Sequence, residues 1–286
     1  MSSIKILDGA LGTEIISQNM SLPNYIWSAH TNTENPHLVY EIHKKYIDSG
    51  ADYITTNTFR TTPRSYLKTG LSINDAKNKS YKSFSNAIKM AIKAQADSQA
   101  KILGSIAPLE DCYTPYDYPG DKIAQLEFLE LYDWFSDSKV DVFMLETMNN
   151  LSEIITCLDV FSSGDVPVWL SLNLLDHNHI LSGESIVDVV KAISKFNVSA
   201  LLLNCNSIEK TNLALETLNR YWNKEWGIYP NIGLGEPIPD GVIYNYSDMN
   251  SFIDVSKKAI GLGATIVGGC CGSNYKHIVA LSNQFK

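Results

Sequence analysis

The chain has 286 residues, of which 44% are hydrophobic and 19% are charged, and its net charge is -8. This is the composition of an ordinary globular protein, and its negative charge argues against nucleic-acid or anionic-membrane partners. The apolar run at the N-terminus is too short for a signal peptide, and no run approaches the roughly 20 apolar residues of a membrane span, so we expect a cytoplasmic protein.

Apolar runs and helical patterns alternate along the chain. The predicted strands cover residues 5–7, 53–56, 102–106, 140–145, 166–172, 201–203, 226–229 and 265–267. Each is followed by a predicted helix, at residues 36–49, 73–100, 124–138, 151–161, 186–196, 210–221, 249–262 and 275–285. Strand–helix units with apolar, non-alternating strands predict a (β/α)₈ TIM barrel, as a single domain over residues 1–286. A doubly wound open sheet is the alternative.

Long segments predicted to be irregular follow three of the strands, at residues 9–35, 108–122 and 232–247. In a barrel such segments lie at the C-terminal face of the strands, where active sites occur. Polar residues just beyond the strands should therefore share one rim; they are Asp8, Asn57, Ser105, Glu146, Asn173, Asn204, Cys205, Asn231, Cys270 and Cys271. Several of these residues can instead cap helices or bind loop backbone.

Three cysteines stand at the ends of two predicted strands. Cys205 follows the sixth strand, and Cys270 and Cys271 follow the eighth within a glycine-rich run. Three converging thiolates would hold Zn²⁺ on three corners of a tetrahedron and leave the fourth for water or a substrate atom. Because the spacing lacks a CxxC pattern, packing or a disulfide is the alternative.

Two carboxylates are further candidates for a substrate site. Asp8, beside glycines, can face a substrate or merely cap its loop. Glu146 ends an apolar strand, so its ionised form would be costly without a cation or several hydrogen-bond donors. A substrate ammonium group would meet this need, and an ion pair with a lysine or arginine is the alternative.

Other polar and aromatic residues of the predicted loops are less specific. Arg60 can bind a carboxylate or be solvated. Trp27, Tyr113, Tyr116 and Tyr118 can hold an onium cation or pack as a lid. The histidines show no metal-binding spacing, and no nucleotide-binding or serine-hydrolase motif is present.

Taken together, the motifs resemble those of the homocysteine S-methyltransferase family, in its zinc-dependent, cobalamin-independent single-barrel form. They are LDGALGTE (7–14), IWSA (26–29), ENPHLV (34–39), SGAD (49–52), TNTF (56–59), ETM with NLSEI (146–155), NCN (204–206), YPN (229–231) and GGCCG (268–272). The resemblance implies a TIM barrel and a methyltransferase that converts homocysteine to methionine with Zn²⁺.

The resemblance also assigns roles to individual residues. It makes Cys205, Cys270 and Cys271 the zinc ligands at the catalytic centre. The remaining positions would contact homocysteine, with the two acidic residues at its amino end; they are Asp8, Gly9, Ala10, Thr58, Phe59 and Glu146. The homocysteine thiol would take the fourth zinc position, lose its proton and attack the donor methyl group.

The methyl donor is less well defined than the acceptor. Residues 107–113 do not match the GPYG-like segment of members that use S-methylmethionine. The chain shows neither the C-terminal extension of betaine-using members nor a cobalamin or folate module, which favours S-methylmethionine or S-adenosylmethionine. A corrinoid or betaine donor, another thiol or selenol acceptor such as selenocysteine, and a zinc- or thiol-sensing barrel are the alternatives. We expect small-molecule substrates and a monomer or small homo-oligomer.

Overall fold

The computed structural model describes residues 3–234, 243 and 245–286. Within them, eight parallel strands pair in the order β1-β8-β7-β6-β5-β4-β3-β2. Their bounds are β1 Lys5–Ile6, β2 Tyr53–Thr55, β3 Lys101–Ile106, β4 Val142–Met148, β5 Val168–Leu172, β6 Val198–Ser207, β7 Glu225–Asn231 and β8 Ile266–Val267. The two ends of this sheet meet where Leu7 bridges Tyr53, so the sheet forms the predicted TIM barrel.

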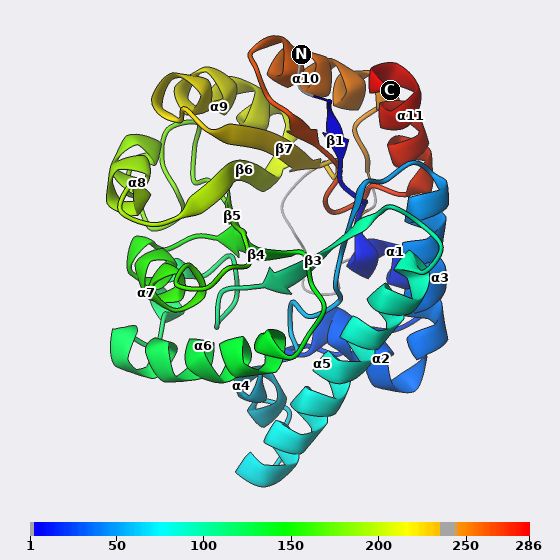
Figure 1. Cartoon of the computed structure of the whole chain (residues 1–286), viewed down its shortest axis with the longest axis vertical. Coiled ribbons are helices and arrows are strands. Elements are labelled where there is room, and N and C mark those ends of the chain that lie inside the picture. Colours follow the sequence, from blue (N-terminus) through cyan, green and yellow to red (C-terminus); the bar gives the residue numbers. More distant parts are fainter. Residues whose placement is uncertain (1–2, 235–242, 244) are drawn as a thin grey trace.

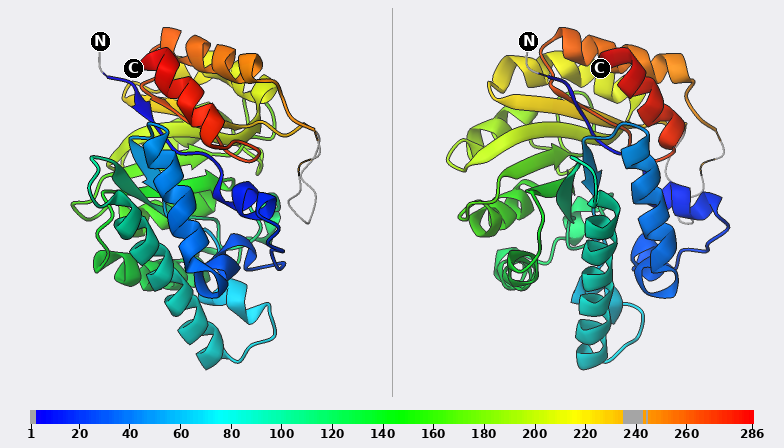
Figure 2. Two further views of the ribbon diagram at one scale, coloured as in Figure 1. Left: turned by 90° about the vertical axis from the view of Figure 1, so that its right-hand side faces the viewer. Right: turned by 45° about the vertical axis from the view of Figure 1, so that its right-hand side comes forward.

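Helices surround the strands, as the view in Figure 1 shows. Their bounds are α1 Leu11–Ser17, η1 Trp27–His30, α2 Thr31–Glu34, α3 Pro36–Asp48, α4 Pro63–Leu67, α5 Ile73–Gln95, η2 Pro115–Asp117, α6 Asp121–Ser136, α7 Leu151–Phe161, α8 Ile186–Ile193, α9 Ile208–Tyr221, α10 Met249–Gly261 and α11 Tyr275–Phe285. The two side views of Figure 2 show that α5 extends beyond the other helices. In the described part of the chain, no helix combines the length and apolar character needed to cross a membrane.

Local capping explains why several helices begin where the sequence predicts. The Asn35 side chain accepts a hydrogen bond from the backbone N–H of Leu38, and Pro36 fills the first helical position of α3. Asn150 caps α7 in the same way. The predicted end of α5 at residue 100 was wrong, because Ala96 leaves the helical conformation with ψ of 135° and Asp97 has φ of 68°.

Two of the three segments predicted to be irregular contain short helices. Residues 9–35 hold α1, η1 and α2, and residues 108–122 hold η2 and the start of α6. The prediction missed the short helices because segments of three to seven residues do not show a helical period. Residues 235–242 and 244 of the third segment lie outside the described residues.

The predicted ends of β4 and β6 were also wrong. Both strands continue past the predicted end, and the pairing register shifts between Leu145 and Met148 and between Asn204 and Ser207. Thr147 and Cys205 have positive φ angles of 59° and 54° at these irregularities. Glu146 and Cys205 therefore lie within irregular strand ends instead of beyond them, and such bulges redirect side chains next to active sites.

Candidate metal centre and substrate pocket

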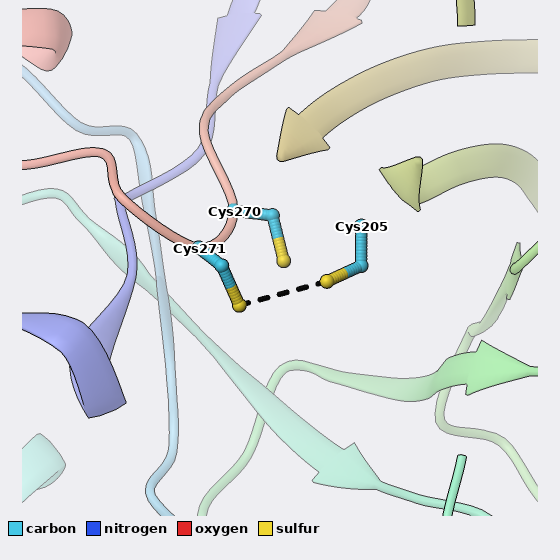
Figure 3. Close-up of side chains that lie close together, drawn as sticks. All are labelled: Cys205, Cys270 and Cys271. Atoms are coloured by element: carbon cyan, nitrogen blue, oxygen red, sulfur yellow. Dashed lines mark hydrogen bonds between the residues drawn. The ribbon is translucent and has the colours of Figure 1, made fainter. Parts of the chain in front are cut away.

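The three cysteines that follow or end β6 and β8 converge. The Sγ atoms of Cys205, Cys270 and Cys271 all lie within 4.8 Å of one another, and those of Cys205 and Cys271 are 3.5 Å apart. Figure 3 shows the three side chains pointing toward a common centre from two segments of the chain. Tetrahedral Zn²⁺ with bonds of about 2.3 Å places its sulfur ligands about 3.8 Å apart, which these positions fit with small adjustments.

Backbone contacts fix the two adjacent cysteines after β8. The N–H of Cys270 donates to the carbonyl of Pro230 (2.9 Å), and the carbonyl of Cys271 accepts from Ile232 (3.0 Å). An added Cβ on Gly268 would lie 2.5 Å from the Cβ of Leu7, so glycine is needed where this turn passes the residue that follows β1. Hydrogen bonds from the Cys205 and Cys270 thiols hold the pKa of Cys271 well below its usual range, so one thiolate forms readily in this cluster.

Asp8 lies directly after β1 and is almost fully buried. Its carboxylate accepts hydrogen bonds from the backbone N–H of Thr55 (2.7 Å) and from the Thr55 hydroxyl (3.0 Å). Burial outweighs these bonds and raises the pKa of Asp8 to about 8. Of the two alternatives for Asp8, the simple loop cap is not observed, because the carboxylate bonds Thr55 of β2 and lines a cavity.

Glu146 shares that cavity, and its carboxylate accepts a hydrogen bond from the Ser105 hydroxyl (2.6 Å). Burial raises the pKa of Glu146 to about 7, and no lysine or arginine among the described residues acts on it. The alternative of an internal ion pair is therefore not seen in this part of the chain. Two buried carboxylates without a protein cation form a site that favours a ligand ammonium group.

The cavity has a volume of about 1000 Å³ and opens at the C-terminal ends of the strands. Its wall includes all three cysteines and both carboxylates. Ligand cavities span about 300–1,000 Å³, so this one has room for two small reactants together. Glu110, Asp111 and Asp117 also line it, and Glu110 pairs with both Lys68 and Arg64. With Asp8 and Glu146, five acidic residues line the described wall against two basic ones, Arg60 and Lys68, and this excess favours cationic ligands.

The other residues expected to contact homocysteine differ in their placement. Gly9, Ala10 and Phe59 line the cavity. A Cβ on Gly9 would lie 2.8 Å from the Tyr46 hydroxyl, so no larger residue fits. The N–H of Ala10 already donates to Ser273 Oγ (3.0 Å). The Thr58 hydroxyl is turned to the backbone, where it donates to the carbonyl of Ser105 (2.7 Å).

Arg60 is half-buried rather than freely solvated, and it lines the cavity. Its Nη1 donates to the carbonyl of Glu110 (2.6 Å) and so holds the segment after β3. Among the aromatic candidates, the hydroxyl of Tyr113 lies 3.3 Å from Cys205 Sγ, Trp27 lines the cavity, and Tyr118 bonds Asp121. Tyr116 is 81% exposed, so it does not face the site.

Sequence reasoning missed two residues of the site. Thr55 orients Asp8, and Tyr229 lines the cavity with its hydroxyl buried near the Glu146 carboxylate. The strand position of Thr55 gave no signal of this role. The YPN motif did contain Tyr229, and a tyrosine at the C-terminal end of a barrel strand was the available sign.

The family model described as homocysteine S-methyltransferase matches residues 5–285 of the chain. The homocysteine S-methyltransferase of Escherichia coli is 27% identical over 97% of this chain and 94% of its own. Homocysteine S-methyltransferase 1 of Brassica oleracea var. italica is 24% identical over 98% of this chain and 93% of its own.

Solved structures agree with the sequence comparison. The metallated form of the E. coli homocysteine methyltransferase MmuM superimposes with a TM-score of 0.84 and 26% identity, over 99% of this chain and 96% of that one. The family match over residues 5–285 spans every strand of the barrel and both segments that carry the cysteines. The chain therefore belongs to the homocysteine S-methyltransferase family of methyltransferases.

Proposed function

We propose that this protein transfers a methyl group from a sulfonium donor to homocysteine, with Zn²⁺ held by Cys205, Cys270 and Cys271. The observation that carries the proposal is the convergence of these three thiols in a cavity that also holds two buried carboxylates. A thiol-rich set of this geometry suits zinc. When bound, zinc supplies a cationic centre beside which a substrate thiol gives up its proton at neutral pH.

The carboxylates account for the amino end of homocysteine. Asp8 and Glu146 are costly to ionise while the cavity is empty, because burial raises the pKa of each. An ammonium group placed between them would favour both charged forms and lower both pKa values. Thr55 and Ser105 hold the two carboxylates in place before the ligand arrives. The acceptor that fits is a small thiol with a primary amine.

The acidic wall of the cavity supports a cationic donor. In the transfer, the homocysteine sulfur forms a bond to the donor methyl carbon, and the bond from that carbon to the sulfonium sulfur breaks. The electron pair stays on the leaving sulfur, which departs as a neutral thioether, and methionine is formed. Holding both reactants in line within one enclosed cavity supplies much of the rate enhancement.

A panel of methyl donors tests the proposal. Zinc-loaded protein is mixed with homocysteine and either S-methylmethionine, S-adenosylmethionine, betaine or methylcobalamin, and methionine is measured. We expect turnover with one of the two sulfonium donors. Methionine formed only from betaine or methylcobalamin would refute the donor assignment, and no methionine from any donor would favour a sensing role.

Variants of the cysteines test the metal assignment. Cys270→Ala and Cys271→Ala should each lose bound zinc, measured by elemental analysis, together with turnover. Cys157→Ala is the matched control, because Cys157 is fully buried in α7 and has no place in the cluster. Retention of both metal and activity in the first two variants would show that the site is wrongly assigned.

A further inference from the structure

The segment after β3 carries a phenol to the cysteine cluster. The hydroxyl of Tyr113 lies 3.3 Å from Cys205 Sγ, although the two residues are 92 positions apart in the chain. The Tyr113 side chain also lines the cavity, and the residue is 39% exposed. Tyr113 therefore belongs both to the cavity wall and to the surroundings of the cysteine cluster.

Side chains of neighbouring turns hold this segment in place at four points. The bonds run from the Leu109 N–H to Glu153 (2.7 Å), from Arg60 to the Glu110 carbonyl (2.6 Å), from Asn149 to the Cys112 carbonyl (2.7 Å) and from Asn150 to the Pro115 carbonyl (3.0 Å). Asn149 and Glu153 are buried. Hydrogen bonds in buried surroundings are costly to break, so the position of Tyr113 is set by the fold.

We propose that the Tyr113 hydroxyl donates a hydrogen bond to the Cys205 thiolate in the metal-loaded protein, making Tyr113 a positioning residue that slows the loss of zinc. The inference rests on the proposed zinc site. A metal-bound cysteine sulfur carries no proton and can only accept, so the phenol is then the donor of this pair. Partners that bond a metal ligand from outside fix its orientation and commonly strengthen metal binding.

The backbone of Cys205 gives a reason for such support. Cys205 has a φ of 54°, in the left-handed region that non-glycine residues seldom adopt, at the irregular end of β6. Residues held in that region persist only when their surroundings constrain them. The contact with Tyr113 comes from the segment after β3 and constrains the one ligand that does not belong to the Cys270–Cys271 turn.

The test compares Tyr113→Phe with Tyr116→Phe. Tyr116 lies on the same segment but is 81% exposed, so removing its hydroxyl is a control for the substitution itself. Each zinc-loaded variant is mixed with a chromophoric chelator in excess, and the release of zinc is followed over time. We expect Tyr113→Phe to release zinc about tenfold faster than the wild type, and Tyr116→Phe to match the wild type. Equal release rates in both variants would overturn the inference.

A second measurement separates this role from donor binding and from a general loss of structure. In the Co²⁺-substituted protein, Tyr113→Phe should shift the sulfur-to-cobalt charge-transfer bands, whereas Tyr116→Phe should not. Asn149→Ala, which frees the Cys112 carbonyl, should accelerate zinc release in the same direction. If Tyr113 served only to bind the methyl donor, Tyr113→Phe would raise the KM for the donor, while the rate of zinc release and the Co²⁺ spectrum would stay unchanged. A wild-type protein that binds no zinc would instead refute the proposed function.

Discussion

Replacing Glu146 by glutamine should stabilise the metal-free protein at alkaline pH and weaken homocysteine binding. Burial raises the pKa of Glu146 from 4.5 to about 7. A group whose pKa is higher in the folded state favours folding fully only below its unfolded pKa, and this contribution is lost as the pH rises through the folded value. At about 1.36 kcal/mol per pKa unit, this shift lowers the free energy of unfolding, relative to its value at low pH, by about 3 kcal/mol at pH 8 and by about 1 kcal/mol at pH 5.

The assay is urea unfolding of wild type and Glu146→Gln at these two pH values, without metal. The variant should gain about 2 kcal/mol more at pH 8 than at pH 5, because glutamine has no proton to lose. Glu153→Gln is the matched control, since burial also raises the pKa of Glu153 to about 7, yet Glu153 does not line the cavity and its carboxylate accepts the Leu109 N–H, a bond that the glutamine carbonyl can still accept. It should show a similar pH-dependent gain while homocysteine affinity is retained.

Two results would refute this reasoning. Parallel stability curves for wild type and Glu146→Gln between pH 5 and pH 8 would mean that burial does not penalise the carboxylate. Unchanged homocysteine affinity in Glu146→Gln, measured by calorimetry on zinc-loaded protein, would mean that the ammonium group binds elsewhere. The two readouts are independent, so either part of the argument can fail alone.

Asp8→Asn should raise the KM for homocysteine about tenfold or more through loss of a charge-assisted bond. Asp52→Asn, which alters a carboxylate that bonds the Ile6 N–H at the opposite barrel end, should leave this KM unchanged, and equal effects would contradict the assignment. Mild oxidation of metal-free protein should join Cys205 to Cys271, whose sulfur atoms are 3.5 Å apart, and remove two titratable thiols together with activity. Activity that survives the loss of those thiols would count against a role for them. Gly268→Ala should lower the free energy of unfolding by about 1–3 kcal/mol, measured by urea unfolding, because its Cβ would collide with Leu7. An unchanged midpoint would show that the turn can relax.

The sequence predicted the barrel, with an open sheet as the alternative, and it placed the three cysteines at one rim, with packing or a disulfide as the alternative. Apolar strands that do not alternate are a strong signal for a parallel sheet, and the topology then brings the ends of β6 and β8 to one rim. The convergence of Cys205 with Cys270 and Cys271 follows from that arrangement. The bulged ends of β4 and β6 could not be predicted, since Thr147 and Cys205 adopt positive φ without the glycine that usually marks it.

The contacts that orient the site depend on residues far apart in the chain. Tyr113 reaches Cys205 from a segment that the side chains of Arg60, Asn149, Asn150 and Glu153 hold. None of these pairings leaves a local pattern in the sequence. From the sequence, Arg60 could only be assigned to carboxylate binding or to the solvent. Positions of this kind are set by tertiary contacts that no window of the sequence contains.

The junction between β1 and β2 serves both the closure of the barrel and the proposed recognition of the substrate. The barrel closes there through the Leu7–Tyr53 bridge, and the Asp8 carboxylate adds two bonds to Thr55. The side chain that would recognise an amino group thus also links the end of the first strand to the second strand. Substitution of Asp8 would therefore affect both acceptor binding and barrel closure. An enzyme redesigned for an acceptor without an amine would need another hydrogen bond between these two strand ends before Asp8 could be replaced.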